Sequence, residues 1–181
     1  MTRPKKRLGL LRHAKSEWDD SVQRDFDRSL NDRGRRGAAL IGDHIRDFGI
    51  KWDAMLASPA ARIKATLETA QLEPAPRFED RLYLASAETI IELVEALGGD
   101  DEPDTVLVVG HNPGLQEALL SLVAPAREND LFREAAVKFP TAAFAVLECA
   151  IESWSDLKVR CATLTHFARP RDLDPALGPE F

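Results

Sequence analysis

The chain has 181 residues, of which 44% are hydrophobic and 30% charged, and its formal net charge is −6. This composition is typical of one ordinary soluble globular domain and excludes collagen-like, disordered and disulfide-scaffold classes. The negative net charge argues against nucleic acid as a partner. Residues 1–36 nevertheless carry a net charge of +5, which leaves −11 for the other 145 residues. An anionic substrate near the N-terminal segment is therefore one interpretation, and a solvated basic end is the other.

The sequence contains no apolar stretch that approaches the roughly 20 residues needed to cross a bilayer, so we expect no membrane partner. The basic start is followed by only four apolar residues, 8–11, before Arg12, which is too short for a signal peptide. Cys149 and Cys161 are too few for a disulfide framework and lack the spacing of a metal site, so we expect a reducing cytoplasm. We expect a single domain over residues 1–181, with flexible ends at about 1–6 and 170–181, that is a monomer or a weak dimer.

The first half of the chain alternates between strand and helix patterns. Residues 7–11 predict a short buried strand, and the polar residues 12–29 that follow predict a loop. Residues 30–49 predict a helix, because Asn31 can cap its start and Gly49 suits its left-handed end. Residues 52–57 return to a strand pattern. Ser58 and Pro59 then predict a helix start, with the Ser58 hydroxyl as the cap and Ile63, Leu67 and Ala70 on the inner face.

The second half continues this alternation and then changes. A brief strand at residues 77–79 precedes a helix that Ser86 caps and that two glycines end at 98–99. Residues 105–110 are almost wholly apolar, as in a central strand, and 113–123 are helical. Residues 142–149 and 157–165 lie close enough for an antiparallel pair, and the tail after 169 is expected to be frayed. These elements predict a three-layer α/β/α fold with a mostly parallel central sheet and an antiparallel C-terminal strand pair.

Cationic and imidazole side chains follow three of the predicted strands. Arg12 and His13 follow the first, Arg62 lies just after the second, and His111 follows the central one. Ligands gather at the carboxyl ends of strands in open α/β sheets, where helix N-termini also favour an anion. Each residue alone has a simpler explanation, such as a solvated turn. Together they would repel one another unless an anion lay between them, so we expect a phosphate site.

The common motifs of nucleotide, zinc, serine and cysteine chemistry are absent from the sequence. Histidine remains as the group that could carry phosphoryl transfer, because a neutral imidazole nitrogen can attack phosphorus and form a phosphohistidine intermediate. Arginines would then neutralise the phosphoryl oxygens in the transition state.

Five segments resemble the histidine phosphatase (phosphoglycerate mutase-like) superfamily, and in particular its short SixA-type phosphohistidine phosphatases. They are residues 10–16 (LLRHAKS), 27–34 (DRSLNDRG), 58–62 (SPAAR) with Thr66, 108–113 (VVGHNP) and 141–143 (TAA). The resemblance spans roughly residues 7–165. It implies a phosphoglycerate mutase-like fold and a phosphatase that works without a cofactor or metal.

The resemblance also implies the site residues. His13 would be the phosphorylated nucleophile, and Arg12 and Arg62 would bind the phosphoryl group. His111 would donate a hydrogen bond to a phosphoryl oxygen, which requires a protonated or suitably tautomeric ring. Arg28 and Ser16 would make further substrate contacts.

Several positions depart from the family pattern. Ala14 stands where many members have Gly, but it is small enough to keep the loop close to a phosphate. Ala65 stands where a Gln often precedes Thr66. Asp19 replaces an Asn of the mutase branch and would repel a dianion, so we expect it to face elsewhere or to pair with Arg28.

The acidic residue that many members carry past the third strand is also missing, since residues 82–85 read LYLA. Glu88 is the nearest candidate for a general acid, although a glutamate in a first helical turn is equally well explained by the helix dipole. An alkoxide leaving group needs a proton donor, which contributes roughly 10²–10⁴-fold, whereas the imidazole of phosphohistidine leaves more readily. A missing acid therefore favours phosphohistidine hydrolysis, and the lack of a lid insertion predicts a shallow pocket that opens to a protein surface.

The sequence thus predicts a phosphatase that acts on phosphohistidine in a phosphorelay protein or another phosphoprotein. A small-molecule phosphomonoesterase is the alternative, and a non-catalytic phosphoprotein-binding module is a third interpretation. Other residues receive simpler interpretations. We expect His44 and His166 to face solvent, whereas Trp18 and Tyr83 either rim the pocket or pack in the core.

Overall fold

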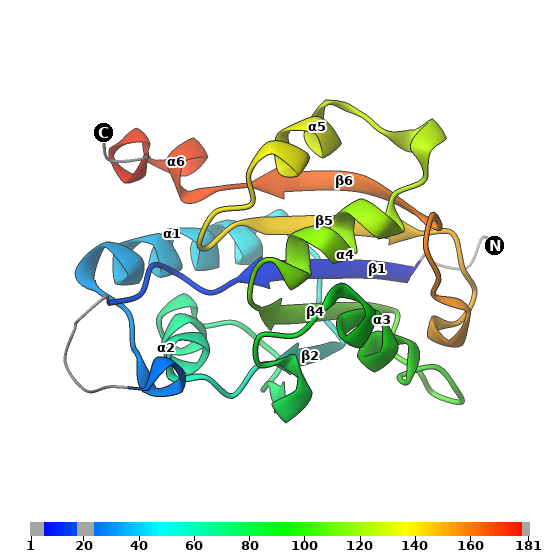
Figure 1. Ribbon diagram of the computed structural model, residues 1–181, viewed down its shortest axis with the longest axis horizontal. Coiled ribbons are helices and arrows are strands. Elements are labelled where there is room, and N and C mark those ends of the chain that lie inside the picture. Colours follow the sequence, from blue (N-terminus) through cyan, green and yellow to red (C-terminus); the bar gives the residue numbers. More distant parts are fainter. Residues whose placement is uncertain (1–5, 18–23, 179–181) are drawn as a thin grey trace.

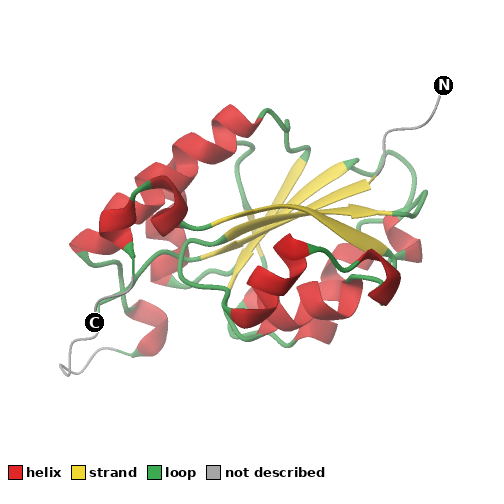
Figure 2. Cartoon of the chain, turned by 90° about the horizontal axis from the view of Figure 1, so that it is seen from above, coloured by secondary structure: helices red, strands yellow, loops and turns green. Residues whose placement is uncertain are grey.

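The computed structural model describes residues 6–17 and 24–178 and consists of one six-stranded sheet between two layers of helices (Figures 1 and 2). The strands are β1 (Lys6–Arg12), β2 (Ala54–Ala57), β3 (Arg77–Phe78), β4 (Thr105–Gly110), β5 (Phe144–Cys149) and β6 (Ala162–Ala168). The helices are α1 (Asp32–Phe48), α2 (Ala61–Ala70), α3 (Ala87–Glu95), α4 (Gly114–Leu122), α5 (Asp130–Val137) and α6 (Pro170–Leu173). None of the helices in these described ranges has the length and apolar character of a membrane span.

The sheet has the order β3-β2-β4-β1-β5-β6. Strands β3, β2, β4 and β1 are parallel, whereas β5 runs antiparallel to both of its neighbours, β1 and β6. This confirms the predicted α/β fold with its antiparallel C-terminal pair. Strand β4 lies inside the sheet and is buried along its whole length, which explains its nearly continuous apolar sequence.

Alternate side chains of β1 and β4 pack into two separate apolar cores, one on each face of the sheet. Leu8 and Leu10 point to the face covered by α3, α4 and α5, whereas Leu11 points to the face covered by α1 and α2. Because successive side chains of a strand point to opposite faces, β4 and the middle of β1, residues 8–11, are apolar on both faces. Helices thus pack on both faces of the sheet, and this packing supports the end of the sheet at which the parallel strands terminate.

Local capping signals explain where some helices begin. Asn31 accepts a hydrogen bond from the backbone of Gly34 at the start of α1, Gly49 is left-handed at its end, and Ser86 caps α3. The prediction for Ser58 was wrong, because α2 begins at Ala61 and its N-cap residue makes no side-chain bond. The Ser58 hydroxyl contacts His111 instead, a partner that lies far away in the sequence.

The C-terminal segment is also ordered where fraying was expected. Residues 170–173 form helix α6, and 175–177 form a further 3-10 turn. The Asp172 carboxylate accepts hydrogen bonds from the backbone N–H and the guanidinium of Arg169, while the buried ring of Pro170 packs close to Gly37 of α1. These contacts hold the segment against α1 through residue 178. Residues 1–5 and 179–181 lie outside the described part of the chain.

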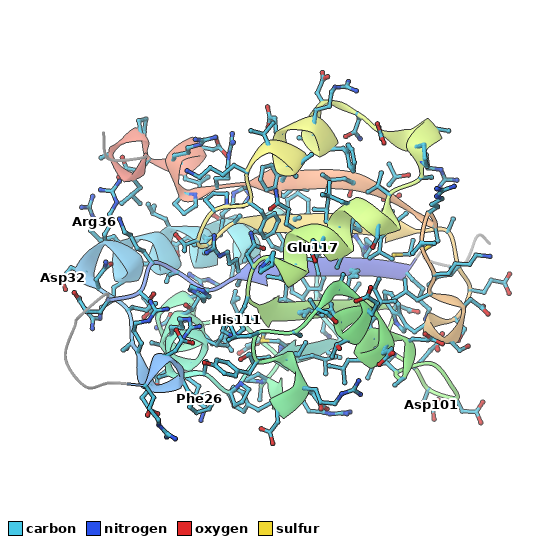
Figure 3. All side chains as sticks on the ribbon, viewed as in Figure 1. Phe26, Asp32, Arg36, Asp101, His111 and Glu117 are labelled. Atoms are coloured by element: carbon cyan, nitrogen blue, oxygen red, sulfur yellow. The ribbon has the colours of Figure 1, made fainter. Side chains whose placement is uncertain are left out.

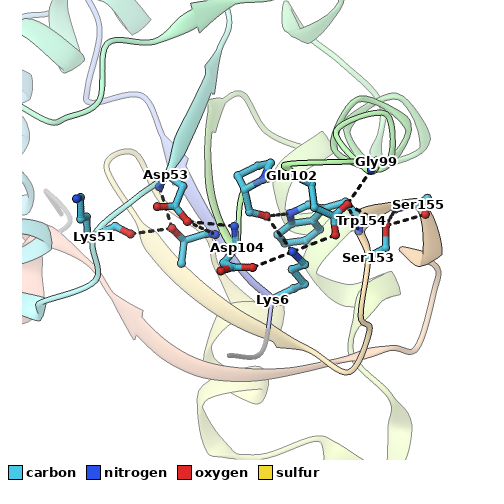
Figure 4. A network of polar contacts seen from close by, with 11 residues as sticks. Lys6, Lys51, Asp53, Gly99, Glu102, Asp104, Ser153, Trp154 and Ser155 are labelled. Atoms are coloured by element: carbon cyan, nitrogen blue, oxygen red, sulfur yellow. Dashed lines mark hydrogen bonds and ion pairs between the residues drawn. The ribbon is translucent and has the colours of Figure 1, made fainter. Parts of the chain in front are cut away.

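The two ends of the sheet differ in character. His111 follows β4 at the end where α2 and the start of α1 lie, and Asp101 lies at the opposite end (Figure 3). At that opposite end the buried ammonium of Lys6 contacts Glu102 at 3.0 Å and Asp104 at 2.9 Å (Figure 4). Removing one partner would leave a buried charge uncompensated, so this network ties the start of β1 to the segment before β4.

Candidate active site

The carboxyl ends of β1 and β4 bring two histidines together. Arg12 pairs in register with Gly110, so His13 and His111 both lie immediately beyond the paired strands. Their ring centroids are 5.4 Å apart, with the planes tilted by 54°. Arg62 enters from the first turn of α2, with its Nη2 atom 3.3 Å from Nδ1 of His111. The structure therefore brings together the residues that the strand-end argument predicted.

The tautomer of His13 follows from its hydrogen bonds. Its Nδ1 atom lies 2.7 Å from the carbonyl oxygen of Ala14, and a carbonyl can only accept, so Nδ1 carries the proton. The Nε2 atom then keeps its lone pair. Burial lowers the pKa of His13 to about 3, and the charges of Arg12 and Arg62 contribute to this shift. At neutral pH the ring is uncharged, and Nε2 is available as a nucleophile.

The loop that carries His13 is fixed by α2. Thr66 accepts a hydrogen bond from the backbone N–H of Ala14 at 3.0 Å and donates its own hydroxyl proton to the carbonyl of Arg62 at 2.7 Å. The side chain of Thr66 is fully buried. One hydroxyl therefore links the loop of His13 to the helix that supplies the buried Arg62.

His111 holds the opposite tautomer. A guanidinium can only donate, so Nδ1 of His111 accepts from Arg62, and the proton lies on Nε2. This Nε2–H donates to the hydroxyl oxygen of Ser58 at 2.8 Å. Burial lowers the pKa of His111 to about 4, with a further contribution from the charge of Arg62. Ser58 therefore positions His111, a role that its predicted capping function missed.

The buried Arg62 and the half-buried Arg12 bring positive charge to the site. The side chain of Arg62 is only 2% exposed, and Nη1 of Arg12 donates to the carbonyl of Phe139 at 3.1 Å. Within the described residues, the Nε atoms of Arg12 and Arg62 have no hydrogen-bond partner. Leaving a buried donor unpaired costs free energy, so both atoms are candidate donors to an anion.

Asp25 is a site residue that the sequence analysis missed. Its carboxylate contacts Nη2 of Arg62 at 3.1 Å and Nη2 of Arg28 at 2.9 Å, and it accepts a hydrogen bond from the Tyr83 hydroxyl. Burial alone would raise the pKa of Asp25, but the hydrogen bonds from Tyr83 and Arg28 and the charge of Arg62 outweigh it and lower the pKa. The only sequence signal was its place in the long loop after β1, where functional residues often lie.

The remaining predicted site residues separate into two groups. Arg28 donates to the Ser16 hydroxyl, and both side chains line the same pocket as His13. Glu88 lies in the first turn of α3, is exposed and does not line this pocket. The Tyr83 ring lies edge-on to His111 at 5.5 Å, which places it at the site.

Two expectations concern residues that the structure leaves undescribed. Asp19 and Trp18 lie outside the described residues, so their predicted orientations have no structural counterpart. Arg28, the residue that Asp19 was expected to pair with, forms an ion pair with Asp25.

His44 and His166 correct another expectation. Both are half-buried rather than solvent-facing, because their rings stack at 5.0 Å with the two Nε2 atoms 2.8 Å apart. Phe48 stacks on the His166 ring at 4.2 Å. The pair joins α1 to β6 and does not line the pocket of His13.

The pocket has a volume of about 500 Å³. Its lining comes from the ends of β1 and β4, from α1 and α2, from the loop before β5 and from the C-terminal segment at 169–171 and 177–178. The C-terminal segment thus forms one wall of the pocket, whereas the sequence predicted a shallow pocket and a frayed C-terminal tail. In the described part of the chain, no group of three or more His, Cys, Asp and Glu side chains is arranged to hold a metal ion.

Comparisons with known proteins agree with this geometry. Residues 8–83 match the model of the histidine phosphatase superfamily, branch 1. An uncharacterized protein of Mycobacterium tuberculosis is 38% identical over 163 residues, which are 89% of this chain and 100% of that protein.

Two solved structures share the fold and are provisionally named phosphohistidine phosphatase SixA. The protein from Nakamurella multipartitia has a TM-score of 0.80 and 30% identity, covering 91% of this chain and 96% of its own. The protein from Agrobacterium tumefaciens has a TM-score of 0.73 and 33% identity, covering 93% and 99%. On this evidence the chain belongs to the histidine phosphatase superfamily, in its SixA-type branch.

Proposed function

We propose that the protein is a phosphatase that hydrolyses phosphohistidine on a phosphorelay protein or another phosphoprotein, through a covalent phosphohistidine on His13. The observation that carries this proposal is the neutral His13 ring, whose Nδ1–H is held by the Ala14 carbonyl so that the Nε2 lone pair is free beside Arg12 and Arg62. Such a ring is a competent nucleophile for phosphorus.

In the first step, Nε2 of His13 attacks the phosphorus atom while the phosphorus–nitrogen bond of the substrate breaks. The released imidazole departs as a neutral molecule once its other ring nitrogen has taken up a proton. Arg12 and Arg62 offer donors to the phosphoryl oxygens, and their charge stabilises the developing negative charge in the transition state. Water then cleaves the phosphorus–nitrogen bond on His13, which releases phosphate and restores the neutral ring.

His111 contributes a second donor once the dianionic phosphoryl group is bound. The dianion favours protonation of Nδ1 of His111. The protonated Nδ1 no longer accepts from Arg62 and donates a hydrogen bond to a phosphoryl oxygen instead. Ser58 keeps Nε2–H bound throughout and so holds the ring in place. The low pKa of the unliganded ring shows that this proton must come with the substrate or from solvent.

The leaving group supports phosphohistidine over a phosphate ester. Glu88 does not line the pocket, and Asp25 is the sole carboxylate among the described residues that line it. The hydrogen bonds and charges around Asp25 lower its pKa, so it is ionised and is a poor proton donor. An alkoxide would therefore leave without the roughly 10²–10⁴-fold help of general acid catalysis, whereas the imidazole of phosphohistidine can take its proton from solvent on the ring nitrogen away from phosphorus.

Turnover of three substrate classes at one enzyme concentration tests the proposal. We expect phosphoramidate and a phosphohistidine peptide to be hydrolysed in the presence of EDTA, and alkyl phosphate esters to be hydrolysed at least a hundredfold more slowly. Faster turnover of sugar or nucleotide monophosphates would favour a small-molecule phosphomonoesterase. No turnover of any substrate would favour a phosphoprotein-binding module.

A further inference from the structure

The pocket continues beyond the phosphoryl site into a region of unusual charge. Five more basic side chains line it, and they come from the loop after β1, from α1, from the loop before β5 and from the C-terminal segment. These residues are Lys15, Arg33, Lys138, Arg169 and Arg171. Only one carboxylate, Asp25, lines the pocket within the described residues, although the whole chain carries more acidic than basic residues. The lining of the pocket is therefore positively charged, whereas the chain as a whole has a negative net charge.

Three of these cations form no direct ion pair within the described part of the chain, although the charge of Arg171 acts on the neighbouring Asp172 carboxylate. Arg169 is held by Asp172 at 3.0 Å and lies over the Phe167 ring. Lys15, Lys138 and Arg171, by contrast, form no ion pair with any residue that the structure describes. We name these three side chains the cationic wall. Like charges that share one cavity repel one another and create a positive potential there, which attracts anions.

Close backbone packing holds the elements of this wall together. A Cβ atom on Gly34 would lie 1.9 Å from the carbonyl oxygen of Lys15, so the loop after β1 lies directly on α1. Pro170 packs on α1 at Gly37 with an ordinary contact, 3.6 Å from where a Cβ would lie, one residue before Arg171. The backbones that carry Lys15 and Arg171 are therefore both held against α1.

The pocket has room for more than a phosphoryl group. Its volume of about 500 Å³ lies within the range of roughly 300–1,000 Å³ that is typical of sites for whole ligand molecules. The wall spreads single charges over three separate elements, and two of the three side chains are lysines. Because the charges lie on three separate elements, the arrangement suits several separate carboxylates along one polypeptide better than one compact second phosphate.

The rim of the pocket adds an apolar contact. Leu84 lines the pocket, yet it is 57% exposed and has a positive φ of 51°. A leucine held exposed in a left-handed conformation costs free energy and is often found at a functional site. An apolar side chain at the mouth fits a polypeptide better than a small phosphorylated metabolite.

We propose that the cationic wall binds carboxylates of the polypeptide segment that flanks the phosphohistidine, so that the enzyme selects phosphohistidine in an acidic sequence. This inference rests on the proposed function and adds the substrate class. The acidic segment would lie between the loop after β1 and the C-terminal segment while the phosphoryl group contacts His13.

The test uses two phosphohistidine peptides of equal length, one with Asp and Glu beside the phosphohistidine and one with Asn and Gln there. At low salt we expect the acidic peptide to have a KM about tenfold lower, since three exposed ion pairs together contribute about that factor. The preference should vanish near 1 M NaCl, where the screening length is about 3 Å. Equal KM values at low salt would overturn the inference.

Charge-removing variants locate the effect. Replacing all three wall residues (Lys15→Gln, Lys138→Gln, Arg171→Gln) should bring the acidic-to-neutral ratio of kcat/KM close to one. The control removes two exposed lysines outside the pocket (Lys51→Gln, Lys158→Gln) and should keep the ratio of the native protein. An equal fall of the ratio in both variants would assign the preference to net charge and overturn the inference.

Phosphoramidate separates this inference from the proposed function, because it carries no second anionic group. Its turnover without an acidic preference overturns only the inference, whereas its failure overturns the proposed function. If phosphoramidate is not hydrolysed, calorimetric titration with the two unphosphorylated peptides still measures whether the protein binds the acidic peptide more tightly. A sugar bisphosphate with a kcat/KM above that of the acidic peptide would assign the wall to a second phosphate and overturn the peptide assignment.

Discussion

His13 and His111 face each other at 5.4 Å as two neutral rings with opposite tautomers. Nδ1 of His13 donates to a carbonyl, whereas Nδ1 of His111 accepts from a guanidinium. Burial lowers the pKa of both rings, so neither carries a charge at neutral pH. One ring thereby presents a lone pair, and the other is ready to take up a proton when a dianion binds.

Replacing the nucleophile should abolish turnover. We expect His13→Ala to lose at least about 10³-fold in kcat for phosphoramidate, because the free Nε2 lone pair is lost, whereas both ring nitrogens of His111 are engaged by Arg62 and Ser58. Labelled phosphate should be trapped on the native protein by acid quenching but not on this variant. The matched control is His44→Ala, since His44 does not line the pocket. A His13→Ala protein with full activity would contradict the covalent mechanism.

Ser58→Ala should lower kcat about tenfold and should alter the pH profile. The substitution leaves Nε2–H of His111 without its acceptor at 2.8 Å in a buried site, and an unpaired buried donor costs roughly 1–3 kcal/mol. Ser58→Thr keeps the hydroxyl and should restore most of the activity. If Ser58→Ala and Ser58→Thr had the same kcat and pH profile, the positioning role would be wrong.

Stability should fall in acid because of the two active-site histidines. Their pKa values of about 3 and about 4 lie below the 6.5 of an exposed histidine, so between these values the unfolded chain binds more protons than the folded one. The contribution of the two neutral rings to the free energy of unfolding is therefore complete above about pH 7. It decreases from pH 6.5 towards 4, by up to about 1.4 kcal/mol per pH unit for each ring.

Urea unfolding at pH 7.5, 6.5, 5.5 and 4.5 measures this dependence. His13→Asn removes one of the two titrating groups, so its free energy of unfolding should decrease less steeply. Equal slopes for the native protein and this variant would show that His13 does not have a lowered pKa.

The two candidate carboxylates should respond differently to neutralisation. Glu88→Gln should leave kcat/KM within about twofold of the native value, because Glu88 is exposed and lies outside the pocket. Asp25→Asn should lower it about tenfold, since Arg62 and Arg28 lose the carboxylate that orients them. Steady-state kinetics with phosphoramidate and with an alkyl ester measure both effects. A selective loss of ester hydrolysis in Glu88→Gln would identify Glu88 as a general acid after all.

Gly34→Ala should destabilise the fold and disturb the pocket. Its Cβ would lie 1.9 Å from the Lys15 carbonyl, so the loop that carries the nucleophile must move. Such overpacking costs typically 1–3 kcal/mol, which for a chain of this size lowers Tm by several degrees. Gly37→Ala on the same helix is the control, because its Cβ has only ordinary contacts, with Pro170 at 3.6 Å. Scanning calorimetry should show that only the first variant loses stability.

Local patterns in the sequence determined most of the secondary structure. The apolar run at 105–110 became the central strand, and the caps Asn31 and Ser86 begin the helices that they predict. The convergence of Arg12, His13, Arg62 and His111 also followed from sequence, because parallel strands deliver their carboxyl ends to one edge of the sheet. These signals act within a few residues or follow from topology alone.

Contacts between distant segments decided the rest. The Ser58 hydroxyl could cap a local helix or bind an imidazole 53 residues away, and only the tertiary structure selects the imidazole. Asp25 reaches Arg62 across 37 positions, and His44 reaches His166 across 122. The C-terminal segment is ordered because Pro170 has a site on α1. A short polar side chain or a proline has several partners of similar local energy, and the packing of the whole fold determines which one is within reach.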